Sequence, residues 1–247
     1  MDLKPETKTM NVSKANIKLV RGLQQKKQRD EQRLFVAEGR KCVEEIAKGF
    51  EQVFLFVEGE NASAEDIARM SSLRTPQGVI GVFRMPDALP LETEGLTVAL
   101  DGVQDPGNMG TIIRTCDWFG VRDVMCSEDT VDCFNPKVVQ ATMGALARVR
   151  VHYTDLSNWL TDVSEKGVPV YGTLLDGKNM YAEGGIQERQ IGVIVMGNEG
   201  NGISQAVRKC ITHPLFIPPY PTDAETSESL NVGIATAVVL AEFRRQL

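Results

Sequence analysis

The feature that most constrains the fold is a set of short apolar runs without polar alternation, of which IGVIVMG at residues 191–197 is the clearest. A strand with one solvated face alternates polar and apolar residues, whereas a strand buried on both faces is a continuous apolar run. LTVALDGV and VRDVMCS follow the same pattern earlier in the chain. These runs predict a parallel β-sheet covered by helices on both faces.

Helical and strand-like segments alternate along the whole chain. In the second part, we expect strands at LTVALDGV, VRDVMCS, PVYGTLL, IGVIVMG and PLFIP, and helices near 111–119, 137–146, 156–166, 205–210 and 230–245. In the first part, RLFVAEG, QVFLFVEG and GVIGVFR are strand candidates between three helical segments. RMPDALPLETEGL has the composition of a linker. We therefore predict a small α/β domain at 1–86, a linker at 87–95 and a larger α/β domain at 96–247.

The net charge of −6 is distributed unevenly. Residues 1–86 carry +3 and residues 87–247 carry −9, and residues 14–41 hold nine basic against three acidic side chains. A basic module beside an acidic one suggests a nucleic-acid partner for the basic part, although a solvated helix face has the same composition. The candidate RNA-contacting residues are Lys14, Lys18, Arg21, Lys26, Lys27, Arg29 and Arg33.

Several classes of protein are disfavoured by residue usage. The five cysteines form no C-x-x-C pair and there are two histidines, so a zinc site or a Ser-His-Asp triad is improbable and no metal is expected. The N-terminus lacks the apolar centre of a signal peptide, and the apolar run at 234–241 is too short to span a bilayer. We expect a soluble, cytoplasmic protein with no membrane partner.

Polar side chains follow three of the predicted strands. Asn108 and Arg114 lie in QDPGNMGTIIRT, Asn198 and Glu199 lie in NEGNGIS, and Ser229 and Asn231 lie in TSESLN. Ligands bind at the carboxyl ends of the strands in such sheets, so these residues could form one polar site. Taken singly, Asn108 could be a turn residue, Ser229 a helix cap and Arg114 a surface residue. Glu199 needs partners at the strand end, such as backbone N–H groups or an arginine, and Arg114 is the candidate arginine.

These three segments resemble the motifs of the SpoU (TrmH) family of RNA ribose 2′-O-methyltransferases, in the SPOUT superfamily. LDGVQDPGNMGTIIRTCDWFGV is similar to the first motif, VIVMGNEGNGIS to the second, and IPPYPTDAETSESLNVGIATAVVLAEFRRQ to the third. The intervening NPKVVQATMGALARV resembles the family's segment between motifs. The resemblance covers residues 96–247, and the N-terminal part looks like the family's small substrate-binding domain.

The resemblance implies an α/β fold with a C-terminal trefoil knot, a homodimer formed through the catalytic domain, and S-adenosylmethionine as cofactor, without a metal. It implies a catalytic set of Asn108, Arg114, Glu199, Ser229 and Asn231. It places the cofactor against Gly197, Ile217 and Leu230, with Leu174 on the preceding loop. Because a guanidinium stays protonated, we expect Arg114 to hold the RNA phosphate and the 2′ oxygen rather than act as a base.

Two other functions remain open from the sequence. A non-catalytic RNA-binding homologue would keep the N-terminal domain but would not need the polar set at the strand ends. A nucleotide-dependent oxidoreductase would share a doubly wound sheet, but the chain has no G-x-G-x-x-G fingerprint. The sequence does not distinguish ribosomal from transfer RNA.

Overall fold

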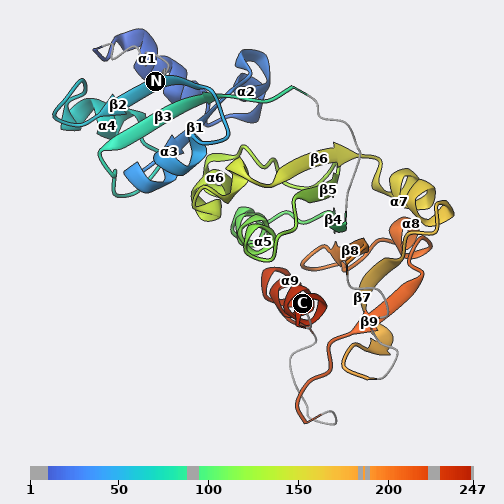
Figure 1. Ribbon diagram of the computed structural model, residues 1–247. Helices are drawn as coiled ribbons and strands as arrows, with labels where there is room; N and C mark the ends of the chain where they lie inside the picture. The colour runs from blue at the N-terminus through green and yellow to red at the C-terminus, as the bar shows by residue number, and fades with distance from the viewer. Residues whose placement is uncertain (1–10, 88–94, 183–185, 187–189, 222–228, 246–247) are drawn as a thin grey trace, which may run out of the picture. The chain divides into compact units, whose positions relative to one another are not determined.

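The computed structural model describes residues 11–87, 95–182, 186, 190–221 and 229–245, which form two compact units (Figure 1). The first unit comprises Met1–Ala88 and Asp132–Arg148, and the second comprises Leu89–Val131 and Val149–Leu247. The sequence places the boundary near residue 86 but misses the return of 132–148 to the first unit. Most of the expected linker lies outside the described residues.

The first unit is built on an antiparallel sheet of three strands. The strands are β1 (Leu34–Glu38), β2 (Gln52–Val57) and β3 (Val79–Arg84), in the order β1-β3-β2. Helices α1 (Lys14–Gly22) and α4 (Ala64–Met70) begin at the capping boxes of Ser13 and Ser63. Their buried side chains share one core with alternate residues of the strands. Helix α2 (Lys26–Gln32) follows α1.

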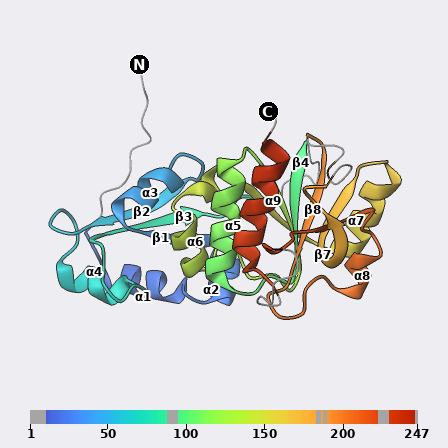
Figure 2. The ribbon, with the colours of Figure 1, turned by 90° about the horizontal axis from the view of Figure 1, so that it is seen from below.

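The opposite face of this sheet is covered by helix α3 (Arg40–Ile46) and by residues 132–148, which are distant in sequence. Helix α3 lies across the sheet from α1 and α4 in Figure 2. Helix α6 (Pro136–Thr142) and a 3₁₀ turn (Ala145–Ala147) complete the unit. The Phe35 ring contacts Phe50, Phe83 and Phe134, with ring centroids 4.8–5.6 Å apart. This aromatic cluster is why residues 132–148 belong to the first unit.

The second unit contains the parallel sheet that the apolar runs predict. Its strands lie in the order β6-β5-β4-β8-β7-β9, and every neighbouring pair is parallel. Their bounds are β4 Leu96–Asp101, β5 Asp123–Ser127, β6 Arg150–Thr154, β7 Val170–Asn179, β8 Gly192–Gly197 and β9 His213–Phe216. Strands β4 and β8 are buried almost throughout, so the prediction of a doubly covered parallel sheet is confirmed.

Helices cover both faces of this sheet (Figure 2). Helices α5 (Pro106–Trp118) and α9 (Val232–Arg244) pack against each other, and the Phe243 ring contacts Tyr171 of β7. Helices α7 (Leu156–Glu165) and α8 (Gln205–Arg208) pack in a second core with residues of β4, β5, β7 and β8. No helix among the described residues has both the length and the apolarity to cross a bilayer.

Two of the observed elements are not predicted from the sequence. Strand β6 has the sequence RVHYT, in which polar residues interrupt the apolar pattern because it is an edge strand. Helix α2, KKQRDEQ, has no apolar residue to show a periodicity. Both elements are specified by their neighbours rather than by a hydrophobic pattern.

Candidate active site

The order of the strands places a topological switch point between β4 and β8. The chain runs outward from β4 through β5 to β6, and then returns to place β8 on the other side of β4. Asp101 and Gly197, at the carboxyl ends of these two strands, lie opposite each other in the register. Ligands bind at such switch points in open α/β sheets, because the two following loops diverge there.

Glu199 joins the loops after β4 and β8. Its Oε1 accepts hydrogen bonds from Asn108 Nδ2 and from the Asp105 backbone N–H, both at 3.0 Å. Its Oε2 accepts from the Gln104 backbone N–H at 3.2 Å. One carboxylate therefore fixes three donors of the first loop.

Asn231 brings the start of α9 to the same cluster. Its Nδ2 donates to Asn108 Oδ1 at 2.8 Å, while its Oδ1 caps α9 by accepting from the backbone N–H groups of Gly233 and Ile234. The sequence suggests Ser229 as the cap, and the structure corrects this to Asn231. Asn108 is consequently held on both sides of its amide, by Glu199 and by Asn231. The three segments thus form one continuous polar network.

The network keeps Glu199 ionised. Partial burial by itself raises the pKa of Glu199, but the hydrogen bonds from Asn108 and from backbone N–H groups outweigh it and hold the pKa below the usual value. A carboxylate with a lowered pKa and with both oxygens occupied is a weak base. Its role in this geometry is to hold Asn108 and the loop.

Arg114 lies apart from this network. It is exposed on α5, as are Thr111 and Trp118, and six residues of helix after Asn108 correspond to about 9 Å along the axis. The expectation that Arg114 pairs with Glu199 is corrected, because Asn108 and the backbone N–H groups take that place. The guanidinium is presented to solvent, where it can meet a ligand.

The four residues expected to hold a cofactor lie in or next to β7, β8, β9 and α9. Gly197 ends β8, Leu174 is half-buried in β7, Ile217 follows β9, and Leu230 precedes α9 with 50% of its surface exposed. A Cβ added at Gly197 would lie 2.3 Å from the carbonyl carbon of Gly202, so only glycine fits there. Ser229 is exposed beside Leu230.

Two further residues support the site, and the sequence prediction lacks one of them, Asp105. Asp105 caps α5 by accepting from the Asn108 N–H at 2.8 Å, and Asn198 Nδ2 donates to the Gly102 carbonyl at 2.7 Å. Asp directly before Pro106 is a recognisable helix-start signal, so Asp105 could have been found. The sequence places Asn198 at the strand end beside Glu199 but does not indicate its partner, which is 96 residues away.

The basic residues of the first unit divide into exposed and buried ones. Lys14, Lys18 and Arg21 are exposed. Lys26 and Lys27 are exposed but pair with Asp30 and Glu31, and exposed Arg33 donates to the Pro86 carbonyl.

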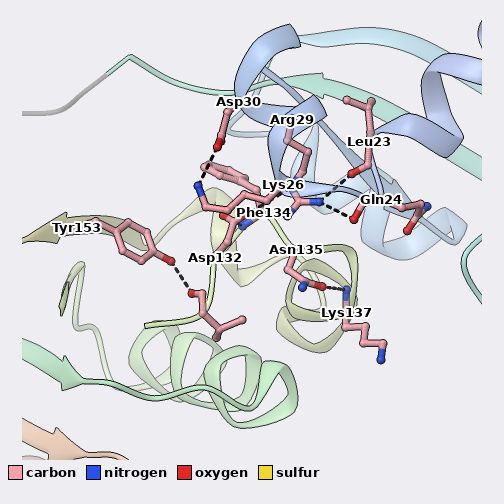
Figure 3. Close-up of polar contacts among 11 residues, drawn as sticks. Leu23, Gln24, Lys26, Arg29, Asp30, Asp132, Phe134, Asn135, Lys137 and Tyr153 are labelled. Carbon is pink, nitrogen blue, oxygen red and sulfur yellow. Dashed lines mark hydrogen bonds and ion pairs between the residues drawn. The ribbon is translucent and has the colours of Figure 1, made fainter. Parts of the chain in front are cut away.

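The sequence suggests that Arg29 faces solvent, but in the structure it is buried. It is 2% exposed, its Nη1 donates to the carbonyls of Leu23 and Gln24 at 2.9 Å, and its Nη2 lies 2.6 Å from Asp132 Oδ2 (Figure 3). The prediction that Arg29 contacts RNA is therefore corrected: its donors are used inside the unit.

Comparisons with known proteins agree on one family. The profile of the SpoU rRNA Methylase family matches residues 95–241, and that of the MRM3-like substrate binding domain matches residues 14–81. The chain is 31% identical over 238 residues to the 23S rRNA (guanosine(2553)-2′-O)-methyltransferase RlmP of Bacillus subtilis, covering 90% of this chain and 93% of that protein.

Solved structures give the same result. A TrmH-family protein from Porphyromonas gingivalis superposes with a TM-score of 0.87 at 39% identity, covering 96% of this chain and 99% of that one. An AdoMet-bound rRNA methyltransferase from Sinorhizobium meliloti superposes with a TM-score of 0.82 at 30% identity, covering 96% and 97%.

Proposed function

The chain belongs to the SpoU rRNA methylase family, and from this premise we propose that it transfers a methyl group from S-adenosylmethionine to a ribose 2′-hydroxyl of structured RNA, ribosomal or transfer. The observation that supports catalysis most directly is the Asn108–Glu199–Asn231 network at the carboxyl ends of β4 and β8. A non-catalytic RNA-binding homologue would have no use for that network.

The residues expected to hold the cofactor fit it chemically. Gly197, Leu174, Ile217 and Leu230 are uncharged, so they offer backbone groups and apolar contact to a nucleoside. Leu230 is exposed, so a ligand that covered it would remove apolar surface from water. When bound, S-adenosylmethionine supplies an electrophilic methyl group.

The protein's own contribution is alignment of the 2′-hydroxyl. Asn108, held from both sides by Glu199 and Asn231, is placed to orient the ribose. Ser229 lies two residues before Asn231, in the segment that leads into α9. Arg114 holds an RNA phosphate and the 2′ oxygen with its planar donor fork. Correct alignment alone can lower a transfer barrier by several kcal/mol.

Further features of the family are proposed on the same basis. The C-terminal part of 96–247 forms a trefoil knot, residues 1–86 act as the substrate-binding domain, and Lys14, Lys18, Arg21, Lys26, Lys27 and Arg33 contact RNA phosphates. The catalytic domain forms a homodimer; in support, Trp118 of α5 is 85% exposed and Ile234 of α9 is 53% exposed. A cytoplasmic location fits the five cysteines, none of which forms a disulfide.

The proposal is tested with the purified full-length chain. We expect isothermal calorimetry to show S-adenosylmethionine binding, and incubation with ribosomal RNA transcripts to yield 2′-O-methylated nucleotides detectable by mass spectrometry. RNA binding without any cofactor binding would overturn the methyltransferase function in favour of the non-catalytic homologue.

Glu199→Gln is expected to lower kcat by roughly 10–100-fold, because misplacing an aligning group by about 1 Å has an effect of this order. The glutamine side chain keeps one acceptor oxygen, but its NH2 group would face a donor from which the other carboxylate oxygen of Glu199 now accepts. Since the pKa of Glu199 lies below its usual value, its stabilising charge is present at all pH values above that usual value and is lost only as the pH falls through the lowered pKa.

The wild-type rate measured by methyl incorporation should therefore show no acidic limb from Glu199 between about pH 6 and 8. Glu165→Gln, at an exposed position at the end of α7, is the matched control and should keep wild-type kcat. Equal rates for the two variants would contradict the role given to Glu199.

A further inference from the structure

The first unit contains a cleft that the polar network at the sheet does not involve. Its lining comes from the end of α1 and from the end of α4 with the residues that follow, and helices α1 and α4 are in contact. We call it the α1–α4 cleft; it is lined by Arg21, Gln24, Ala68, Arg69, Met70, Ser71 and Ser72. Its volume of about 500 Å³ lies in the usual range of sites for small ligands.

The residues that line the cleft carry more hydrogen-bond donors than the protein uses. Arg21 and Arg69 are both exposed, and the contact that Arg69 makes with Glu65 is long, at 4.0 Å between exposed side chains. Gln24 Nε2 is buried and has no hydrogen-bond partner among the described residues. A buried donor without a partner is costly and uncommon, and a ligand that accepts from it is one explanation.

The walls of the cleft are fixed from behind. The buried carboxylate of Glu38 accepts from the Ser71 hydroxyl, from the Ser72 hydroxyl and from the Ser72 backbone N–H at 2.8 Å. On the α1 side, Arg29 holds the carbonyls of Leu23 and Gln24, so the backbone that carries the Gln24 side chain is anchored (Figure 3). A preorganised set of donors loses little entropy when it binds.

We propose that the α1–α4 cleft binds one nucleotide of the RNA substrate, with its phosphate on Arg21 and Arg69 and with an oxygen of its ribose or base accepting from Gln24 Nε2. The inference rests on the proposed function for the identity of the ligand as RNA. Guanidinium groups match phosphate oxygens with paired hydrogen bonds, and two of them flank the cleft. Arginines in the last turn of a helix also offset its dipole, but that role leaves the buried Gln24 donor without a partner.

The test uses the full-length chain with a 23S rRNA transcript, the substrate class named for the B. subtilis relative. Arg21→Gln and Arg69→Gln should each weaken RNA binding by roughly tenfold and lower the slope of log affinity against log salt by about one. Lys48→Gln is the control, because Lys48 is an exposed cation of the same unit that pairs with Glu45 and does not line the cleft. It should change affinity by no more than about twofold.

Gln24→Leu separates binding from folding. Removing an unpartnered buried donor should leave the melting temperature unchanged or higher, whereas RNA affinity should fall several-fold because the contact is lost. The proposal is overturned if the Arg21/Arg69 double variant binds RNA with the same affinity and salt slope as Lys48→Gln. It is also overturned if inorganic phosphate shifts the Gln24 amide resonance while RNA affinity is unchanged in every variant, since the cleft would then hold a free anion.

Cofactor binding and methyl transfer are measured in parallel on the same proteins. A wild-type chain that binds the transcript without methylating it contradicts the proposed activity. In that case the RNA affinities of the variants still show whether the α1–α4 cleft binds RNA. Unchanged cofactor affinity in the variants shows that their effect is on RNA.

Discussion

Asp132→Asn is expected to lower the free energy of unfolding of the first unit by about 3 kcal/mol, because it leaves the guanidinium of Arg29 buried without a counter-charge. Arg29 is 2% exposed and the side chain of Asp132 is 13% exposed, so water cannot replace the lost carboxylate well. Urea titration followed by circular dichroism, with hydrogen exchange to assign the transition to the first unit, measures the change.

Asp30→Asn makes the same chemical change in a solvent-exposed pair. Asp30 lies 2.8 Å from Lys26, with more than half of each side chain exposed, so the substitution should shift stability by less than about 0.5 kcal/mol. If the two variants unfold at the same urea concentration, the buried pair does not stabilise the unit as argued.

Arg114→Lys is expected to lower kcat for methyl transfer at least 100-fold while S-adenosylmethionine affinity stays within about twofold of wild type. Lysine keeps the charge but cannot present the planar pair of donors that a phosphate and a neighbouring oxygen require. Methyl incorporation under single-turnover conditions and calorimetry with the cofactor measure the two effects separately.

Arg122→Lys, at another exposed arginine of the second unit, is the matched control and should behave as wild type. Near-normal turnover of Arg114→Lys would remove Arg114 from the reaction and leave the Asn108–Glu199–Asn231 network as the whole polar site.

The parallel sheet and the meeting of the polar loops could be predicted because each strand, and the polar residue that follows it, is recognisable from local sequence. IGVIVMG is apolar because β8 is buried on both faces, and Glu199 directly follows it. Once the strands are parallel, residues at their carboxyl ends share one edge, which is how Asn108 and Glu199 come together. The partners within that edge were not predictable, since an exposed Arg114 and a backbone N–H are equally acceptable to a carboxylate.

The predictions that the structure corrects concern residues whose surroundings are set by distant parts of the chain. A basic segment containing Lys26, Lys27 and Arg29 looks uniformly solvated, yet Arg29 turns inward to Asp132, 103 residues later. No local pattern distinguishes Arg29 from its neighbours. The same long-range packing, through Phe134 and Asp132, explains why the expected boundary at residue 86 describes only part of the first unit.

The return of residues 132–148 to the first unit has a consequence during synthesis. Chains usually fold domain by domain from the N-terminus as they emerge from the ribosome. Here the nascent N-terminal part lacks the Phe134 ring and the Asp132 carboxylate until the first strands of the second unit have also been translated. The two units are therefore expected to mature together, and a nascent chain arrested shortly after residue 86 should remain more sensitive to protease than one arrested after residue 148 has left the exit tunnel.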